Sequence, residues 1–144
     1  MTTTQDWAGL AGRLDATLHP TAPPVAITFS AEAPAGVAAF DDPVPAPSAD
    51  GRTGRVPAGC VFWMTAGDRT FTTVAADHGN CSVGSLTHGF ITMEEAATRG
   101  DVAALLESGW VTMDMVPHIP LVSEEPGAVT YGPLAAGATE VVFE

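Results

Sequence analysis

The sequence predicts a single α+β domain over residues 1–144, in which a mixed or antiparallel sheet is covered by a few short helices. One observation is composition: a chain of 144 residues with 46% hydrophobic and 15% charged side chains can form one sizeable core. Another is order, because a segment with helical periodicity comes first and short apolar runs typical of strands follow it. A doubly wound parallel sheet is the alternative.

The first expected element is an amphipathic helix over residues 4–18. Thr3 and Asp6 can cap its start, and Pro20 prevents its continuation. The apolar run over 24–29 then predicts a buried strand. The helix is inferred from apolar side chains at helical spacing, namely Trp7, Leu10, Ala11, Leu14 and Leu18.

Residues 40–59 predict a long loop, because four prolines and three glycines fall among them. Such a composition sustains neither a helix nor a sheet ladder. A loop of this length is usually either a lid over a site or a disordered segment. Arg52 and Arg55 lie in it and could hold an anionic ligand if the loop closes, whereas a solvated flap is the alternative.

Two β-rich runs, 60–64 and 70–75, predict a hairpin with its turn near Gly67. This register places Cys60 at the end of the hairpin from which the chain continues to Cys81. If the intervening loop folds back over that end, the two sulfurs come within about 7 Å of each other.

Three short helices are expected after the hairpin. The first begins near Asn80 or Ser82 and stops at Gly89. The second begins at a capping box formed by Thr92 and Glu95. The remaining elements are a helix that Asp101 caps and that ends at Gly109, and strands over 128–131 and 139–143.

Charge narrows the range of functions. Five Lys+Arg residues oppose 17 Asp+Glu residues, which gives a net charge of −12, and all five basic residues are arginines. The lack of lysine excludes Schiff-base chemistry and a P-loop lysine. A basic surface for nucleic acid or an anionic membrane is not expected. No apolar run approaches a membrane span and no signal-peptide pattern is present, so we expect a cytoplasmic protein with reduced thiols.

Cys81 is the most reactive-looking residue, because it lies where a polar, glycine-containing loop enters a helix. His78 could orient or deprotonate it, and Asp77 could hold the imidazole. Cys60, Cys81 and His78 together are suitable ligands for zinc, an iron–sulfur cluster or haem iron. The preferred expectation is therefore a protein that binds a metal or an iron-containing cofactor. A redox function of that cofactor is one form of this expectation. His88 fits a cation beside a helix C-terminus.

Two other functions stay open. One is a cofactor-free thiol enzyme or small-molecule binding protein, in which Cys81 is a reactive thiolate and His78 its base, under the loop at 40–59. The other is a scaffold protein with two unreactive cysteines, in which Cys60 is a core residue. A half-site with two cysteines could also be completed by a second copy, so we expect a homodimer.

Met113, Met115 and His118 form a run of soft ligands of the kind that copper favours. The alternative is that the two methionines fill gaps in the core beside Pro117.

Several short motifs follow one another in a characteristic order: Pro24-Val25-Ala26-Ile27-Thr28-Phe29, Ala33-Pro34-Ala35-Gly36-Val37, Cys60, Cys81-Ser82-Val83-Gly84 with Gly89-Phe90, Val129-Thr130-Tyr131-Gly132-Pro133-Leu134 and Glu140-Val141-Val142-Phe143. In this order, from about Leu10 to Phe143, the chain resembles the uncharacterised ArCR-type family, domain of unknown function 169. Members usually have Cys-Pro where this chain has Cys81-Ser82 and continue further, so the resemblance implies a short variant. It also implies that Cys60 and Cys81 occupy the family's cysteine positions, and it implies no activity.

Overall fold

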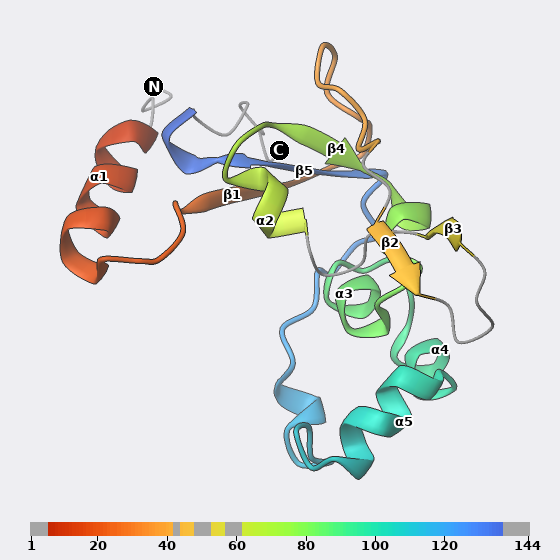
Figure 1. Ribbon diagram of the computed structural model, residues 1–144. Helices are drawn as coiled ribbons and strands as arrows, with labels where there is room; N and C mark the ends of the chain where they lie inside the picture. The colour runs from red at the N-terminus through yellow and green to blue at the C-terminus, as the bar shows by residue number, and fades with distance from the viewer. Residues whose placement is uncertain (1–5, 42–43, 48–52, 57–61, 137–144) are drawn as a thin grey trace. The chain divides into compact units, whose positions relative to one another are not determined.

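The computed structural model describes residues 6–41, 44–47, 53–56 and 62–136, and they have the α+β fold that the sequence predicts (Figure 1). The chain divides into two compact units, and each is described by itself. The sheet unit contains the described residues of 6–41, 62–74 and 127–136. The helical unit contains those of 44–56 and 75–126.

The sheet unit is built on three antiparallel strands in the order β1-β5-β4 (Figure 1). These are β1 (Val25–Ser30), β5 (Ala128–Pro133) and β4 (Phe71–Thr73). The central strand is buried along its first five residues, since both edges are paired and its side chains form the core. Tyr131 lies opposite Ile27 on one side and opposite Phe71 on the other. The strands predicted at 24–29 and 128–131 are confirmed, but β1 is not the buried strand expected, because it lies at the edge of the sheet and is mostly half-buried with Ile27 exposed. The run at 139–143 lies outside the described residues.

Aromatic rings fill the core of the sheet unit. The ring centroid of Phe40 lies 5.0 Å from those of Phe62 and Phe71. Phe71 in turn stacks on Tyr131 with centroids 5.5 Å apart. Burial of the hydroxyl-bearing ring raises the pKa of Tyr131 above its ordinary value. Ring pairs at these separations stabilise a core beyond the effect of their buried area alone.

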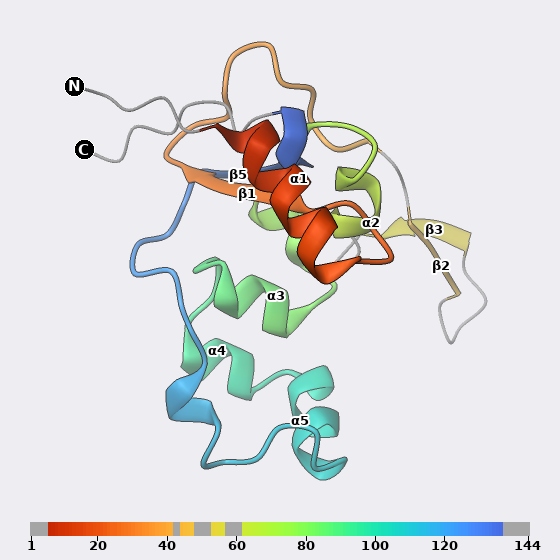
Figure 2. The same ribbon diagram turned by 90° about the vertical axis from the view of Figure 1, so that its left-hand side faces the viewer.

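Helix α1 (Trp7–Leu18) begins at Asp6, whose carboxylate accepts a hydrogen bond from the Gly9 amide at 2.8 Å. It ends at His19, which adopts the left-handed conformation with φ +46°. The helix lies beside the 3₁₀ turn η4 (Leu134–Ala136) that follows β5 (Figure 2). The predicted helix over 4–18 is therefore confirmed from Trp7 onward, and Thr3 lies outside the described residues.

The predicted hairpin is wrong, because helix α2 (Phe62–Ala66) precedes β4 instead of a strand, but the strand expected within 70–75 is present as β4. Phe62 and Ala66 are buried whereas Trp63 and Met64 are exposed, so the pattern of burial has a helical period. A short, continuously apolar run cannot be assigned to strand or helix from periodicity alone. The expected register of Cys60 across the hairpin is lost with it, and Cys60 itself lies outside the described residues.

The predicted loop at 40–59 contains a ladder that the sequence did not predict. Strand β2 (Val44–Pro47) pairs antiparallel with β3 (Thr53–Val56). Pro45 and Pro47 are two residues apart, so their backbone nitrogens face the same edge of the strand. A two-stranded ladder is hydrogen-bonded along one edge of each strand only, so the prolines are tolerated if their nitrogens face the unpaired edge. Of the two arginines expected to hold an anion, Arg52 lies outside the described residues and Arg55 lies on β3 opposite Pro45, so that expectation stays a prediction.

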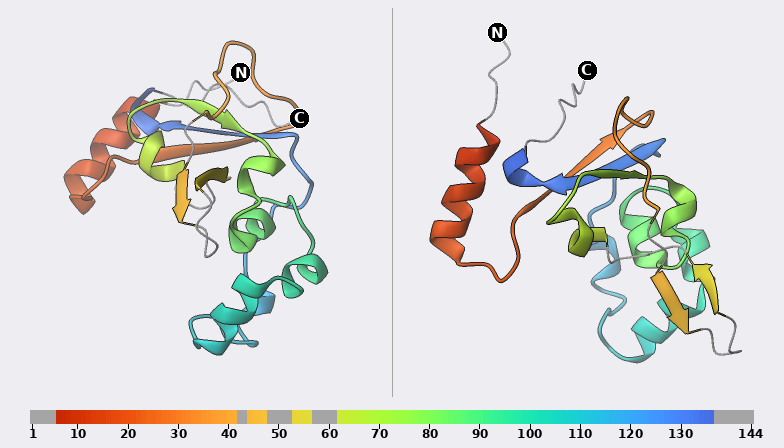
Figure 3. Two further views of the ribbon diagram at one scale, coloured as in Figure 1. Left: turned by 45° about the vertical axis from the view of Figure 1, so that its right-hand side comes forward. Right: turned by 45° about the horizontal axis from the view of Figure 1, so that its top comes forward.

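The helical unit contains three short α-helices and two 3₁₀ turns within its described residues (Figure 3). α3 is followed by Gly89 with φ +79°, as predicted. The capping box of Thr92 and Glu95 is also present. Asp101, however, does not cap α5, because Arg99 holds the cap position. The elements are η2 (Ala75–His78), α3 (Ser82–Thr87), α4 (Met93–Ala97), α5 (Gly100–Glu107) and η3 (Val116–His118).

Among the described residues, no helix has the length and apolar character that crossing a membrane requires.

Candidate functional site

The candidate site lies in the helical unit, where η2 runs through a tight turn into α3. The backbone amide of Cys81 donates to the carbonyl of His78 at 3.1 Å, which closes the turn. The Ser85 hydroxyl donates to the same carbonyl at 2.8 Å. Two donors on one oxygen hold His78 beside the first turn of α3. The structure therefore places His78 and Cys81, two of the three site residues expected from the sequence, in one turn of the chain, whereas the third, Cys60, lies outside the described residues.

Cys81 is the N-cap residue of α3, with an extended backbone. Its sulfur accepts a hydrogen bond from the Gly84 amide at 3.3 Å, and its carbonyl accepts one from the Ser85 amide at 2.9 Å. The residue is half-buried, and its sulfur is disulfide-bonded, which differs from the reduced thiol expected from the sequence. The chain has one other cysteine, Cys60, which lies outside the described residues. An amide donor aimed at the sulfur would stabilise a thiolate when the disulfide is reduced.

His78 is only 2% exposed and packs among other rings. The centroid of its ring lies 4.9 Å from that of His88 and 4.9 Å from that of Phe90. Burial, together with the nearby charge that His88 carries when protonated, lowers the pKa of His78 to about 4. His78 is therefore neutral at pH 7, which is the form that binds metals or accepts a proton.

His88 is the second imidazole of the site, and its protonation follows from its hydrogen bond. Its Nδ1 lies 2.8 Å from the carbonyl oxygen of Gly84. A carbonyl can only accept, so Nδ1 carries the proton and Nε2 is the basic nitrogen of the neutral ring. Burial lowers the pKa of His88, although the bond to Gly84 opposes the shift. The neutral ring is thus favoured over the cation that the sequence suggested.

The start of α3 is anchored to α5 through Asp101. One carboxylate oxygen accepts from the Ser82 amide at 2.9 Å, and the other accepts from the Ser82 hydroxyl at 2.7 Å. Partial burial would raise the pKa of Asp101, but these hydrogen bonds outweigh it and the pKa is lowered. Arg99 reaches the Gly79 carbonyl at 3.4 Å. The loop that carries Cys81 is therefore held from the α5 side as well.

Sequence reasoning did not predict the pairing of the two histidines or the role of Asp101. His78 and His88 are ten residues apart in the sequence and flank the short helix α3. After α3 the left-handed Gly89 turns the chain back, and the Phe90 amide donates to the Ser85 carbonyl at 2.8 Å. The available signal was that both histidines flank one short helix. Asp77 is half-buried beside His78 in η2. Within the described residues, no group of three or more His, Cys, Asp or Glu side chains is arranged to hold a metal ion.

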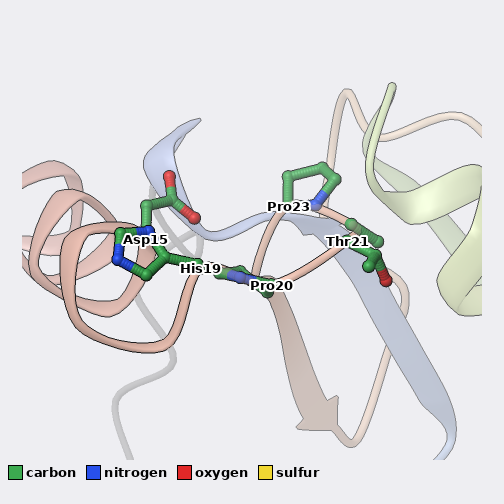
Figure 4. A pocket seen from close by; sticks show the side chains of 6 residues that line it. Asp15, His19, Pro20, Thr21 and Pro23 are labelled. Atoms are coloured by element: carbon green, nitrogen blue, oxygen red, sulfur yellow. The ribbon is translucent and has the colours of Figure 1, made fainter.

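A second concave feature belongs to the sheet unit (Figure 4). It is an open hollow of about 480 Å³ where α1 ends and the chain turns toward β1. Figure 4 shows the Asp15 and His19 side chains on one side of it and Pro23 on the other. Its lining contains no cysteine and none of the site residues expected from the sequence. The residues are Asp15, His19, Pro20, Thr21, Ala22 and Pro23.

Comparison with known proteins identifies a family but not a reaction. No curated protein and no solved structure shows significant similarity to the chain. One family model matches residues 13–143, which include both cysteines and the whole of the candidate site. Because this match spans nearly all of the sequence, the chain belongs to the uncharacterised ArCR family, domain of unknown function 169.

Proposed function

We propose that the protein is a cytoplasmic thiol redox protein, in which Cys81 and Cys60 alternate between a disulfide and two thiols. The observation that carries the proposal is the disulfide-bonded sulfur of Cys81 in a turn that also holds a buried imidazole. Cys60 is the only other cysteine in the sequence, so it is the proposed partner. A reversible disulfide is what a thiol pair forms in a compartment that keeps most thiols reduced.

The proposed cycle balances with an external dithiol as the reductant. A thiolate of that dithiol attacks one sulfur of the pair, the disulfide breaks, and the other sulfur leaves as a thiolate. The second thiol of the reductant then resolves the mixed disulfide. In total, two electrons and two protons pass to Cys60 and Cys81, and the reductant becomes a disulfide. The Gly84 amide supports the thiolate at Cys81, and neutral His78 can exchange the proton.

A second candidate function is that the reduced pair binds a metal or an iron-containing cofactor. The observation in its favour is the pair of imidazoles on the segment that also carries Cys81, with ring centroids 4.9 Å apart and both pKa values lowered by burial. Neutral imidazole and thiolate are the ligands that zinc and iron use in such sites. A twofold dimer would bring four thiolates together, so a homodimer is part of this candidate.

The reduction potential of the disulfide tests the first proposal. The protein is equilibrated in glutathione buffers of graded potential, and its free thiols are alkylated and counted by mass spectrometry. We expect a midpoint above about −300 mV, because structural disulfides are more stable to reduction than that. A midpoint below this value, or a protein in which the disulfide never forms, contradicts a redox role.

Thiol reactivity provides a second test. In a Cys60→Ser background, the rate of Cys81 alkylation is followed against pH, with Cys81→Ser as the matched control. We expect a midpoint below the free-thiol value of about 8.5. A midpoint at or above that value means that the site does not activate Cys81.

Anaerobic purification tests the second candidate. The metal content and the visible spectrum are measured on the reduced protein and on its His78→Phe and Cys81→Ser variants. Bound metal that both substitutions remove supports metal binding at this site. A colourless protein with less than roughly 0.1 equivalent of any transition metal contradicts it.

A further inference from the structure

The segment after α5 presents two methionines and a histidine on consecutive turns. The Met115 amide donates to the Thr112 carbonyl at 2.9 Å, and the His118 amide donates to the Met115 carbonyl at 2.9 Å. Both bonds span three residues, as in a 3₁₀ helix, and the second leads into η3. Side chains three residues apart eclipse one another in this geometry. Met115 and His118 therefore project from the same side of the segment.

The exposure of these side chains excludes the core role that was the alternative for them. Met113 is 71% exposed and Met115 is 49% exposed, and His118 is exposed as well. A methionine that fills a gap in a core is buried, and exposure of such an apolar side chain brings no stability. The segment thus holds two thioethers and one imidazole in solvent within six residues, which packing does not explain.

We propose that Met113, Met115 and His118 form a binding site for one monovalent copper ion. Thioether sulfur is a soft ligand that selects Cu(I), and imidazole is suited to copper as well. Eclipsed Met115 and His118 supply two ligands from one side of the turn. Met113 lies two residues before Met115, and its three rotatable side-chain bonds let its sulfur approach from the neighbouring side.

A carboxylate within the segment favours a cation, and the thioether ligands favour Cu(I) among cations. The Asp114 carboxylate lies between Met113 and Met115 in the chain and accepts a hydrogen bond from the Thr112 hydroxyl. One carboxylate beside one imidazole is too few hard ligands for zinc, which takes four ligands. Two thioethers favour the softer Cu(I).

The test uses the full chain in its disulfide form, so that no free thiol competes for the metal. Methionine methyl groups are labelled with ¹³C, and Cu(I) is added anaerobically as its acetonitrile complex without thiol reductant. The chain has five methionines, so the methyl resonances of Met1, Met64 and Met93 are internal controls. We expect the resonances of Met113 and Met115 to move and to saturate at one equivalent. Zn²⁺ should leave both in place.

Matched substitutions measure the affinity by competition with a chromogenic Cu(I) chelator. Met113→Leu with Met115→Leu, and separately His118→Asn, should weaken Cu(I) binding by about 10–100-fold or more, because loss of a ligand costs at least as much as loss of a residue that orients one. Met64→Leu is the control, since Met64 is also exposed. Uniform movement of all five methyl resonances, an equal response to Zn²⁺, or an unchanged affinity in the double variant would overturn the proposal.

Discussion

The buried histidine of the candidate site should make folding stability depend on pH well above the range in which carboxylates titrate. In the folded protein burial lowers the pKa of His78 to about 4, whereas a histidine in an unfolded chain has a pKa near 6.5. Between about pH 4 and pH 6.5, His78 is therefore protonated in the unfolded state but neutral in the folded state. The stability that neutral His78 provides is complete above pH 6.5, and it is lost progressively as the pH falls toward 4.

The magnitude follows from these two pKa values. Between pH 7 and pH 5, linkage of one such histidine lowers the free energy of unfolding by about 2 kcal/mol. His88 adds to this effect in the same direction, because burial also lowers its pKa. Asp101 does not contribute in this window, since its lowered pKa confines its titration to more acidic pH.

Urea unfolding of the metal-free disulfide form at pH 7, 6 and 5 measures the effect. His78→Phe keeps an aromatic ring beside Phe90 and removes the titrating group, so its stability should lose most of the pH dependence. His19→Asn is the matched control, because asparagine tolerates the left-handed backbone found there and the residue is exposed. A wild-type stability that is flat between pH 7 and pH 5 would refute the reasoning. So would a His78→Phe variant that keeps the full slope.

Three further predictions concern stability and can be read from the urea midpoint of each variant. Phe71→Ala removes a fully buried ring from the core of the sheet unit, so it should cost about 3–5 kcal/mol, and a loss below 1 kcal/mol would contradict the packing. Asp101→Asn weakens two charge-assisted hydrogen bonds from Ser82. Because Asp101 is exposed, the free energy of unfolding should fall by only about 1 kcal/mol. Glu107→Gln on the same helix is the control and should change the free energy of unfolding little. Gly127→Ala would place a Cβ against the Ala31 carbonyl oxygen, so it should lower the midpoint clearly, whereas Gly12→Ala, whose Cβ would meet nothing, should not.

The sequence alone was sufficient for elements that depend on local signals. The helix ending at Leu18, the capping box of Thr92 and Glu95, and the stop at Gly89 all follow from contacts within a few residues. The α+β class and the strand at 128–131 also followed, because a β-branched run bounded by glycines is a local pattern. The position of Cys81 at the start of a helix was predicted for the same reason.

Tertiary structure decided the features that depend on distant neighbours. The apolar run that includes Phe62 became a helix, because burial of Phe62 and Ala66 against the sheet selects a helical period that a short apolar run does not reveal. β2 pairs with β3 in a segment whose prolines predicted a loop, since the unpaired edge of a two-stranded ladder tolerates residues without an amide donor. The contact of His78 with His88, and the bond from Ser82 to Asp101, join residues ten and nineteen positions apart. Such contacts exist only once helices have packed, because packing determines which side chains are buried together, and burial in turn determines their pKa values.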